Sequence, residues 1–406
     1  MRVLYFHQHF TTPTGATGTR SYEMARRLIA RGHQVTMVCG SYNMGNTGLT
    51  SDFINGVRQG IVDGIEVIEF YLPYSNYDNL LKRSWIFLRF ALGSIKLALT
   101  AEYNLLFATT TPLTVAIPGI VMKAFKNRPF VFEVRDLWPE LPKAMGVITN
   151  PLLLKALDIL EWLAYHTADA CIGLSPGIVK GIVCRKPSAK VTMIPNGCDL
   201  ELFKPNPEAK CNLLGIRDDD FVALFCGAHG KANGLDALLD AGKVLKEKGR
   251  TDIKLVLIGD GKLKPNFIQR ATEEGLDNCL FFQPMPKLEL AKVMATANVG
   301  LMILANVPAF YYGTSPNKFF DYIACGLPVL NNYPGWLAEL IDGHYCGITC
   351  PPNDAVAFAN ALSQLADNRQ ETLIRGKNAR QLAESSFSRE ALANQFVDYL
   401  EKVLQG

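Results

Sequence analysis

Short apolar runs alternate with amphipathic segments along the chain, and this alternation predicts its elements. Residues 3–6 form an apolar run, and after a glycine-containing loop Tyr22, Ala25, Leu28 and Ile29 recur at helical spacing. Strand, amphipathic helix and strand in this order are the unit of a parallel sheet covered by helices. Further strands of the first half are expected at residues 35–39, 64–70, 105–108, 130–134, 170–173 and 191–194.

The second half of the chain repeats this pattern. Apolar runs at residues 222–226, 254–258, 280–282 and 299–304 predict strands, and a helix is expected from Leu235. Residues 195–207 are rich in Pro, Asn and Gly, which suits a connector. We therefore predict an α/β protein with two doubly wound lobes, residues 1–200 and 201–387, whose ligands bind outside the carboxyl ends of the strands.

Length and composition agree with two globular lobes. A chain of 406 residues exceeds one ordinary hydrophobic core, and 49% apolar with 19% charged residues leaves no low-complexity segment. A net charge of +3 without a dense basic run argues against nucleic acid as a partner. Ten cysteines without paired metal-type spacing, and no signal-peptide core at the start of the chain, predict reduced interior thiols, no metal and a cytoplasmic location.

Residues 79–101 break the pattern. This segment has no acid, and Lys82, Arg83, Arg89 and Lys96 stand among apolar and aromatic residues. A helix that crosses a bilayer would not carry two unpaired bases through its middle, whereas an interfacial helix could lie among the lipid headgroups. The alternative is a core helix whose basic side chains reach out to water.

The segment from Gly313 to Asp321 is the most informative candidate site. Ser315 is expected to cap a helix that begins at Pro316, and free amides at such a start form an anion site. Lys318 in the first turn adds a positive charge at a position where the helix dipole favours acids. The same site is expected to contain Asn317 beside Ser315, and Asp321 could reach a ribose hydroxyl.

Two glycine-rich loops follow the first strands of the second half. Gly227, His229, Gly230 and Asn233 come after residues 222–226, and Gly259 with Gly261 come after residues 254–258. Glycines let the backbone approach a phosphate at such a junction, although each loop alone is ordinary turn chemistry. His229 is either a phosphate or sugar contact or simply exposed. The expected donor site is completed by Met285.

The first half carries its own candidates at strand ends. Gly15 and Ala16 lie in a loop of small residues before the first helix, which lacks the spacing of dinucleotide-binding sites. Arg135 and Asp136 follow residues 130–134 directly, at the end of a strand where substrate is bound in this architecture. They are candidates for positioning substrate, and a structural ion pair is the competing interpretation.

Taken together, these segments resemble retaining glycosyltransferase family 4, and within it the bacterial O-antigen and capsule enzymes of the N-acetyl-L-fucosamine transferase type. The resemblance covers about residues 1–350 and rests on the order of several motifs. These motifs are Gly15-Ala16-Thr17-Gly18-Thr19-Arg20, Gly32-His33-Gln34-Val35, Glu133-Val134-Arg135-Asp136-Leu137-Trp138-Pro139, Ile194-Pro195-Asn196-Gly197-Cys198-Asp199 with Phe203, Gly227-Ala228-His229-Gly230 to Gly234, Gly259-Asp260-Gly261, and residues 315–329.

The resemblance implies a GT-B fold: two facing Rossmann-like lobes, the donor on the second, the acceptor on the first, and a last helix, residues 388–406, that packs back on the first lobe. It also implies a retaining reaction without metal or cofactor. The sequence departs from the family where a first glutamate is usual, since Gly313 stands there and Asp321 holds the second position. Lys318 then becomes the chief cation expected to bind the diphosphate of the donor.

The expected reaction moves a sugar, N-acetylated in the branch that the sequence resembles, from a UDP-sugar to a polyprenyl-diphosphate-linked saccharide. Lys318, Arg135 and Asp136 are the residues expected to act in catalysis. The enzyme would then sit peripherally at the inner face of the cytoplasmic membrane, held by residues 79–101. A UDP-sugar 2-epimerase and a two-lobed sugar-binding protein are the alternatives.

Overall fold

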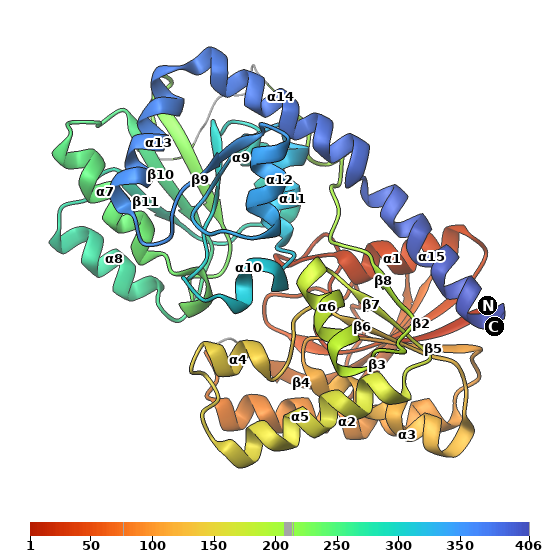
Figure 1. The fold of residues 1–406 in the computed structure, drawn as a ribbon. Helices are drawn as coiled ribbons and strands as arrows, with labels where there is room; N and C mark the ends of the chain where they lie inside the picture. Colours follow the sequence, from red (N-terminus) through yellow and green to blue (C-terminus); the bar gives the residue numbers. More distant parts are fainter. Residues whose placement is uncertain (76, 207–212, 214, 406) are drawn as a thin grey trace. The chain divides into compact units, whose positions relative to one another are not determined.

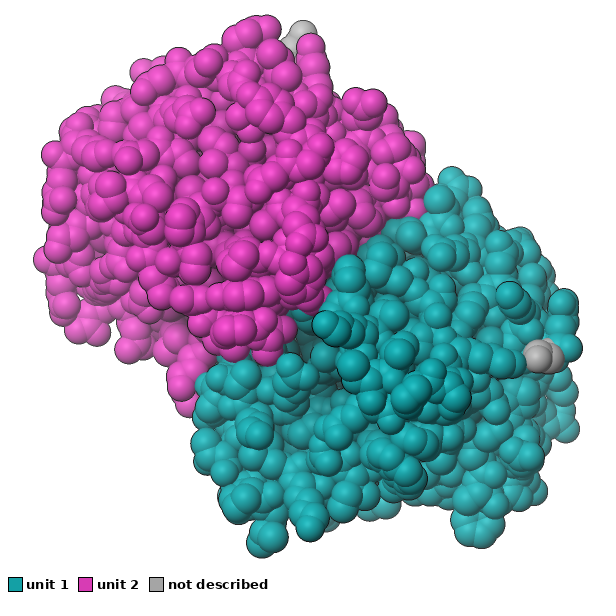
Figure 2. Space-filling view, in the orientation of Figure 1, with its two compact units in different colours: residues 1–195, 313–315, 390–406 teal, residues 196–312, 316–389 magenta. Residues whose placement is uncertain are grey.

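The computed structural model describes residues 1–75, 77–206, 213 and 215–405, which form two compact α/β units (Figures 1 and 2). The first unit comprises Met1–Pro195, Gly313–Ser315 and Glu390–Gly406. The second comprises Asn196–Tyr312 and Pro316–Arg389.

The first unit is built on a sheet of eight strands in the order β3-β4-β2-β1-β5-β6-β7-β8, in which all neighbours are parallel except β3 and β4. The chain moves outward from β1 in both directions, so the sheet is doubly wound as predicted. The strands are β1 (Arg2–Phe6), β2 (Gln34–Tyr42), β3 (Val57–Val62), β4 (Ile65–Tyr74), β5 (Leu105–Thr109), β6 (Phe130–Val134), β7 (Ala170–Gly173) and β8 (Val191–Met193).

Strand β3 is absent from the sequence-based prediction, which had a single strand at residues 64–70. The structure has a hairpin of β3 and β4 instead, and Asp63 and Gly64 form its tip with φ angles of 50° and 84°. An Asp-Gly pair suits this two-residue turn because both positions need a positive φ. Residues 57–62 were not recognised as a strand because Arg58, Gln59 and Gly60 interrupt its apolar residues at the edge of the sheet.

Helices cover both faces of this sheet (Figure 1). Leu4 and Phe6 of β1 belong to one buried cluster with side chains of α2, α3, α5 and α6, whereas Val3 and Tyr5 belong to another with side chains of α1 and α15. This alternation follows from the two-residue period of a strand. The helices are α1 (Arg20–Ala30), α2 (Leu80–Thr100), a 3-10 turn η1 (Leu113–Ala116), α3 (Ile117–Lys126), α4 (Glu140–Ala144), α5 (Pro151–Thr167), α6 (Pro176–Arg185) and α15 (Arg389–Gln405).

The second unit is built on a sheet of six parallel strands in the order β11-β10-β9-β12-β13-β14. The first four strands agree with the predicted runs, and the two short strands at the other edge were not predicted. The strands are β9 (Phe221–Cys226), β10 (Ile253–Ile258), β11 (Cys279–Phe282), β12 (Val299–Met302), β13 (Val329–Asn331) and β14 (Gly347–Thr349).

Helix α11 packs directly against this second sheet. Gly300 of β12 lies under the ring of Tyr322, so closely that an added Cβ would come within 2.3 Å of it. The hydroxyl of Tyr322 accepts a hydrogen bond from the backbone N–H of Cys226 at 2.9 Å, which ties α11 to β9. The helices are η2 (Lys231–Asn233, a 3-10 turn), α7 (Asp236–Glu247), α8 (Lys264–Glu273), α9 (Lys287–Met294), α10 (Ala309–Gly313), α11 (Asn317–Ala324), α12 (Trp336–Gly343), α13 (Ala355–Asp367) and α14 (Arg369–Ser386).

The last helix packs on the first unit, as the resemblance implied. Phe396 of α15 contacts the ring of Phe107 on β5, with ring centroids 5.0 Å apart. Arg31 at the end of α1 pairs with Asp398 at 3.0 Å and with Glu401 at 3.1 Å. The C-terminal segment is therefore an integral part of the first unit.

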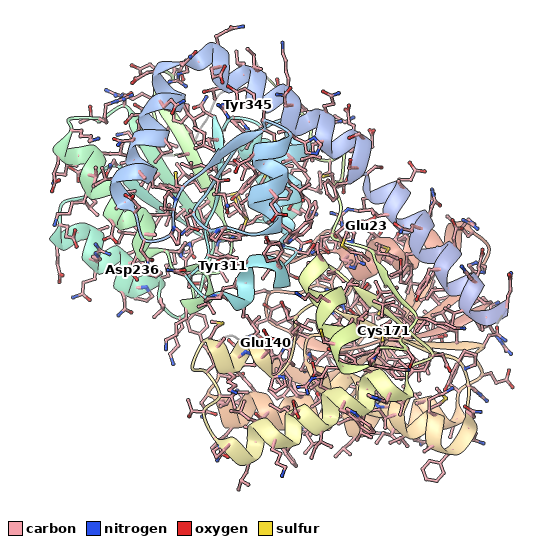
Figure 3. The ribbon with its side chains drawn as sticks, viewed as in Figure 1. Glu23, Glu140, Cys171, Asp236, Tyr311 and Tyr345 are labelled. Atoms are coloured by element: carbon pink, nitrogen blue, oxygen red, sulfur yellow. The ribbon has the colours of Figure 1, made fainter. Side chains whose placement is uncertain are left out.

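The described cysteines are free thiols, and all of them except Cys184 are buried. Cys171 on β7, for example, lies inside the sheet of the first unit (Figure 3). This agrees with the prediction of reduced interior residues, while Cys211 lies outside the described residues. Within the described part of the chain, no three His, Cys, Asp or Glu side chains are grouped as metal ligands would be.

Candidate functional site

The loops after β9 and β10 pack backbone against backbone in the second unit. His229 donates its N–H to the carbonyl of Asp260 at 2.9 Å, and Gly227 donates to the carbonyl of Ile258 at 3.0 Å. A Cβ on Gly259 would stand 1.9 Å from the carbonyl oxygen of Gly227. Gly259 is therefore required by the contact between the two loops, whether or not a phosphate approaches it.

Gly261 is likewise required by close packing between the two loops, whereas Gly230 is not. A Cβ on Gly261 would stand 2.6 Å from the carbonyl oxygen of His229, whereas one on Gly230 would meet nothing within 4 Å among the described residues. The backbone at Gly230 consequently faces open space just before η2. Of the predicted glycines, this one leaves the most room for a ligand.

Lys318 brings three elements of the second unit together. Its amine donates a hydrogen bond to Oδ1 of Asn233 at 2.6 Å and lies 3.4 Å from the carbonyl oxygen of Ile303. It also lies 4.2 Å from the ring centroid of Phe225, in cation–π geometry. The amide of Asn233 is held in turn by the carbonyl of Ala228 at 2.7 Å, so that the loop after β9 positions the acceptor of Lys318.

The charge of Lys318 is weakly compensated. Across the described parts of the chain, no carboxylate lies within ion-pair distance of its amine. Burial lowers the pKa of Lys318 to about 7. A side chain in the first turn of α11 also faces the positive end of that helix. An anion bound here would supply a negative charge that no described carboxylate supplies.

The start of α11 differs from the prediction by one residue. The helix begins at Asn317, and Pro316 occupies the cap position with an extended backbone, at φ −70° and ψ 129°. Ser315 is buried just before it, and because Pro316 holds the cap position, the predicted role of Ser315 as N-cap is wrong. Phe319 donates its N–H to the carbonyl of Pro316 at 3.2 Å, and the anion site expected at the start of this helix stays a prediction.

His229 is buried, which excludes an exposed turn histidine. Its ring lies among Phe225, Phe267 and Phe281, with centroid distances of 6.1, 6.5 and 6.2 Å. Burial lowers its pKa to about 4, so the imidazole is neutral at neutral pH. Neither ring nitrogen has a hydrogen-bond partner in the described structure, and both are covered from solvent.

Lys264 is a buried cation that the sequence-based prediction missed. Its amine donates to the carbonyl oxygens of Gly259 at 2.7 Å and Phe282 at 2.8 Å, and so joins the loops after β10 and β11. A lysine in the first turn after Gly-Asp-Gly was the available signal. Met285 lies half-buried in the loop that follows β11.

Asp321 lies on the buried side of α11. Its carboxylate is 3.7 Å from the amine of Lys287, the first residue of α9, and burial raises its pKa. The side chain thus has a cationic partner within the second unit. Its predicted contact to a ribose hydroxyl stays a prediction.

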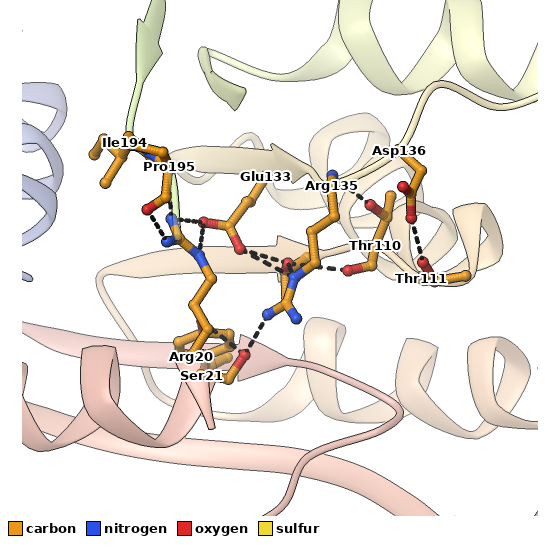
Figure 4. A network of polar contacts seen from close by, with 11 residues as sticks. Arg20, Ser21, Thr110, Thr111, Glu133, Arg135, Asp136, Ile194 and Pro195 are labelled. Atoms are coloured by element: carbon orange, nitrogen blue, oxygen red, sulfur yellow. Dashed lines mark hydrogen bonds and ion pairs between the residues drawn. The ribbon is translucent and has the colours of Figure 1, made fainter. Parts of the chain in front are cut away.

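Arg135 of the first unit belongs to a buried network (Figure 4). Glu133 accepts from Arg20 at 2.8 Å and from Thr109 at 2.7 Å, and it lies 3.4 Å from Arg135. Arg135 also donates to Ser21 at 2.7 Å. Burial raises the pKa of Glu133, but the two guanidinium groups outweigh it and hold the pKa below its usual value.

The network identifies which residues the sequence-based prediction missed. Arg20 and Glu133 form its centre, and Arg20 donates further to the carbonyl oxygens of Ile194 and Pro195 at 2.8 and 2.6 Å. An acid in the middle of an apolar strand was the available signal, since a charge buried there needs a partner. Arg135 is paired structurally, but with Glu133 rather than with its neighbour Asp136.

Asp136 lies outside this network. Its carboxylate accepts a hydrogen bond from Thr111 at 3.2 Å, and burial raises its pKa. On β1's carboxyl side, the amide of Gln8 is buried and its two polar atoms have no partner in the described structure. At these strand ends Asp136 is half-buried, whereas Gln8 is covered from solvent.

Gly15 and Ala16 shape the loop before α1. A Cβ on Gly15 would stand 2.2 Å from Oγ1 of Thr11, and Ala16 donates its N–H to the carbonyl of Met44 at 3.1 Å. This packing explains the small residue at position 15. Ala16 itself is exposed.

Two family models match the chain in succession. Residues 15–197 match the glycosyl transferase 4-like domain, and residues 208–382 match the glycosyl transferases group 1 model. The two matches leave only short segments of the chain outside them. Neither the epimerase nor the sugar-binding alternative is favoured by these matches.

Known proteins of similar sequence are named as glycosyltransferases, and a solved structure shares the fold. The chain is 26% identical over 308 residues to a probable glycosyltransferase, WbjE, of Pseudomonas aeruginosa, covering 73% of this chain and 75% of that protein. It is 22% identical over 261 residues to O-antigen chain mannosyltransferase C of Escherichia coli, covering 64% and 67%. The structure of Anabaena Alr3699/HepE in complex with UDP superposes with a TM-score of 0.70 at 19% identity, covering 99% of this chain and 100% of that one.

Proposed function

Because the chain is a glycosyltransferase with the GT-B fold, we propose that it transfers a sugar from a UDP-sugar to a lipid-linked saccharide during assembly of a surface polysaccharide. The observation that carries the donor side of this proposal is Lys318, a half-buried cation with no carboxylate within ion-pair distance in the described part of the chain. A diphosphate beside the start of α11 would complete that site. The O-antigen enzyme and the UDP complex among the similar proteins support the acceptor and the nucleotide.

The second unit would hold the donor. Lys318 and the first amides of α11 would bind the diphosphate and stabilise the charge that grows on it as the glycosidic bond breaks. The open backbone at Gly230 would let the phosphates approach the loop after β9.

The first unit would receive the acceptor saccharide. Asp136 lies half-buried at the carboxyl end of its strand and has carboxylate oxygens to offer to sugar hydroxyls. The network of Arg20, Glu133 and Arg135 would hold the end of β6 in place so that Asp136 keeps its position. Arg135 is on this account a positioning residue.

The reaction we propose retains the configuration of the donor sugar. The bond between the anomeric carbon and the phosphate oxygen breaks, and the acceptor oxygen bonds to that carbon on the same face. The proton of the acceptor hydroxyl goes to an oxygen of the leaving diphosphate, so UDP departs protonated there. No metal or cofactor is required in this scheme, because Lys318 and backbone amides supply the positive charge.

A panel of nucleotide sugars tests the donor assignment. A UDP-sugar at about 100 times its dissociation constant is expected to add about 2.7 kcal/mol to the free energy of unfolding. N-acetylated sugars linked to UDP are expected to stabilise most, and transfer to a polyprenyl-diphosphate saccharide should follow by chromatography. If GDP-sugars stabilise the protein and UDP-sugars do not, the nucleotide assignment is wrong.

A single substitution tests whether Lys318 belongs to the donor site. Asn233→Asp would place a carboxylate beside the Lys318 amine, where the amide oxygen now lies at 2.6 Å. The added charge should repel the diphosphate and weaken UDP binding by at least about tenfold. Asn360→Asp, at an exposed position on α13, is the matched control and should leave the dissociation constant unchanged. Unchanged UDP binding by the Asn233 variant would remove Lys318 from the donor site.

A further inference from the structure

Three helices of the first unit expose apolar side chains on the same side of the sheet. Helices α2, α3 and α5 all pack on the cluster that contains Leu4 and Phe6, α3 contacts both of the others, and they lie together in Figure 1. Their outward sides therefore form one surface. We call this surface the three-helix face.

The α2 part of this face is an apolar stripe. Leu81, Trp85, Leu88 and Leu92 recur every three or four residues, and all four are exposed, Leu81 to 83% and Trp85 to 59%. The inward positions of the same helix, such as Phe90, are fully buried. The core needs only one side of α2, so the second apolar side is not explained by folding of this unit.

Helices α3 and α5 extend the stripe, and the sequence alone did not indicate this. On α5, Leu152 is 78% exposed, and Ile159 and Trp162 follow at helical spacing with about half of their surface exposed. On α3, Phe125 is 75% exposed. Exposed tryptophans on two helices suit an interface between apolar and aqueous layers.

The unpaired charges on the three-helix face have one sign. Arg89 and Lys96 on α2, Lys126 on α3 and Lys155 on α5 are basic, and none has an ion-pair partner among the residues that the structure describes. The acids of α5, Asp158 and Glu161, are both paired with Arg185 at or near contact distance. The face thus adds unpaired positive charge to exposed apolar side chains.

We propose that the three-helix face binds the surface of an anionic lipid bilayer. Apolar side chains with interleaved bases are the features of a helix that lies in the headgroup layer. None of the described helices is long and apolar enough to cross a membrane, so the face would lie on the bilayer. A second copy of the same face would instead bring like charges together.

This inference rests on the proposed function in one respect, namely that a lipid-linked acceptor makes a bilayer the expected occupant. The face itself depends only on exposure and charge. Residues 79–101 had two interpretations, an interfacial helix and a core helix. On our proposal both apply, because one side of α2 packs in the core and the other side is available to lipid.

Vesicle co-sedimentation of the full chain tests the proposal. We expect binding to phosphatidylcholine vesicles that contain phosphatidylglycerol, and at least about tenfold weaker binding to phosphatidylcholine alone. The double substitution Leu81→Ser/Leu152→Ser should weaken binding to the anionic vesicles at least about tenfold, and so should Arg89→Glu/Lys96→Glu.

Matched controls keep the test specific. Ile54→Ser/Ile61→Ser removes two apolar side chains of the first unit that are 76% and 79% exposed but lie outside the three helices. Lys243→Glu/Lys292→Glu reverses two exposed charges of the second unit. Both control variants should bind the anionic vesicles within about twofold of the unsubstituted chain.

Three results would overturn the proposal. The first is no binding of the unsubstituted chain to anionic vesicles, and the second is equal loss in the face and control variants. The third is that the face variants still bind vesicles but no longer form a dimer, or no longer bind an acidic protein, that the unsubstituted chain forms or binds. UDP-induced thermal stabilisation, measured without vesicles, is independent of the face, so its loss would count against the donor site and not against this surface.

Discussion

Two cations, the buried Arg20 in the first unit and the half-buried Lys318 in the second, have very different partners. Arg20 donates to Glu133 and to two backbone carbonyls, so its charge and its donors are satisfied within the protein. The amine of Lys318 contacts the amide oxygen of Asn233, the carbonyl oxygen of Ile303 at 3.4 Å and the face of the Phe225 ring. The difference indicates that the first cation holds the fold together, and it motivates our proposal that the second binds the diphosphate of the donor.

The largest expected effect is on stability, through Glu133→Ala. Removing this acid leaves two guanidinium groups without their buried partner, which typically costs about 3–5 kcal/mol. Urea unfolding should report the loss. Glu102→Ala is the matched control, because Glu102 also pairs with an arginine at 2.8 Å but in an exposed position. It should change stability by no more than about 1 kcal/mol, and equal losses in both variants would break the comparison.

The next effect is on turnover, through Lys318→Ala. Loss of this cation from the growing charge of the leaving diphosphate should lower turnover by about 10²-fold or more. The free energy of unfolding should change by less than about 1 kcal/mol, because the amine is not part of a satisfied ion pair. Lys262→Ala, at an exposed position after β10, should keep normal turnover. A folded Lys318 variant with near-normal turnover would assign the diphosphate to other residues.

The smallest effect is a pH dependence of UDP binding. The amine of Lys318 in the free protein loses its proton as pH rises through about 7, whereas the bound diphosphate favours the ammonium. UDP binding therefore takes up a proton, and its dissociation constant should rise about tenfold between about pH 6 and pH 8. Isothermal titration calorimetry in buffers of different ionisation enthalpy measures both quantities.

Lys318→Arg serves as the control for this titration. A guanidinium group stays charged over the whole range, so the variant reports only the titration of the UDP phosphate itself. Its dissociation constant should rise less with pH than that of the unsubstituted chain. The same pH dependence in both proteins would mean that Lys318 does not control the binding of UDP.

Part of the candidate site was predictable because it follows from local rules. The apolar run at residues 130–134 is the strand β6, with the bounds that its pattern predicted. Lys318 was identified as a base in the first turn of a helix, where it breaks a local preference. The cap at Ser315 was wrong because the backbone of Pro316 stays extended, and no residue type fixes that dihedral.

The sequence by itself determined the class of fold, the order of most strands and the chemistry available at their ends, because the periods of strands and helices are local properties of the chain. Only the tertiary structure decided which charges are neutralised. Glu133 and Arg20 are separated by 113 residues, and Lys318 and Asn233 by 85, so their contacts depend on how the strands are ordered. The exposure of the apolar stripe on α2 was decided in the same way, since an apolar residue is buried only where the fold brings another surface to cover it.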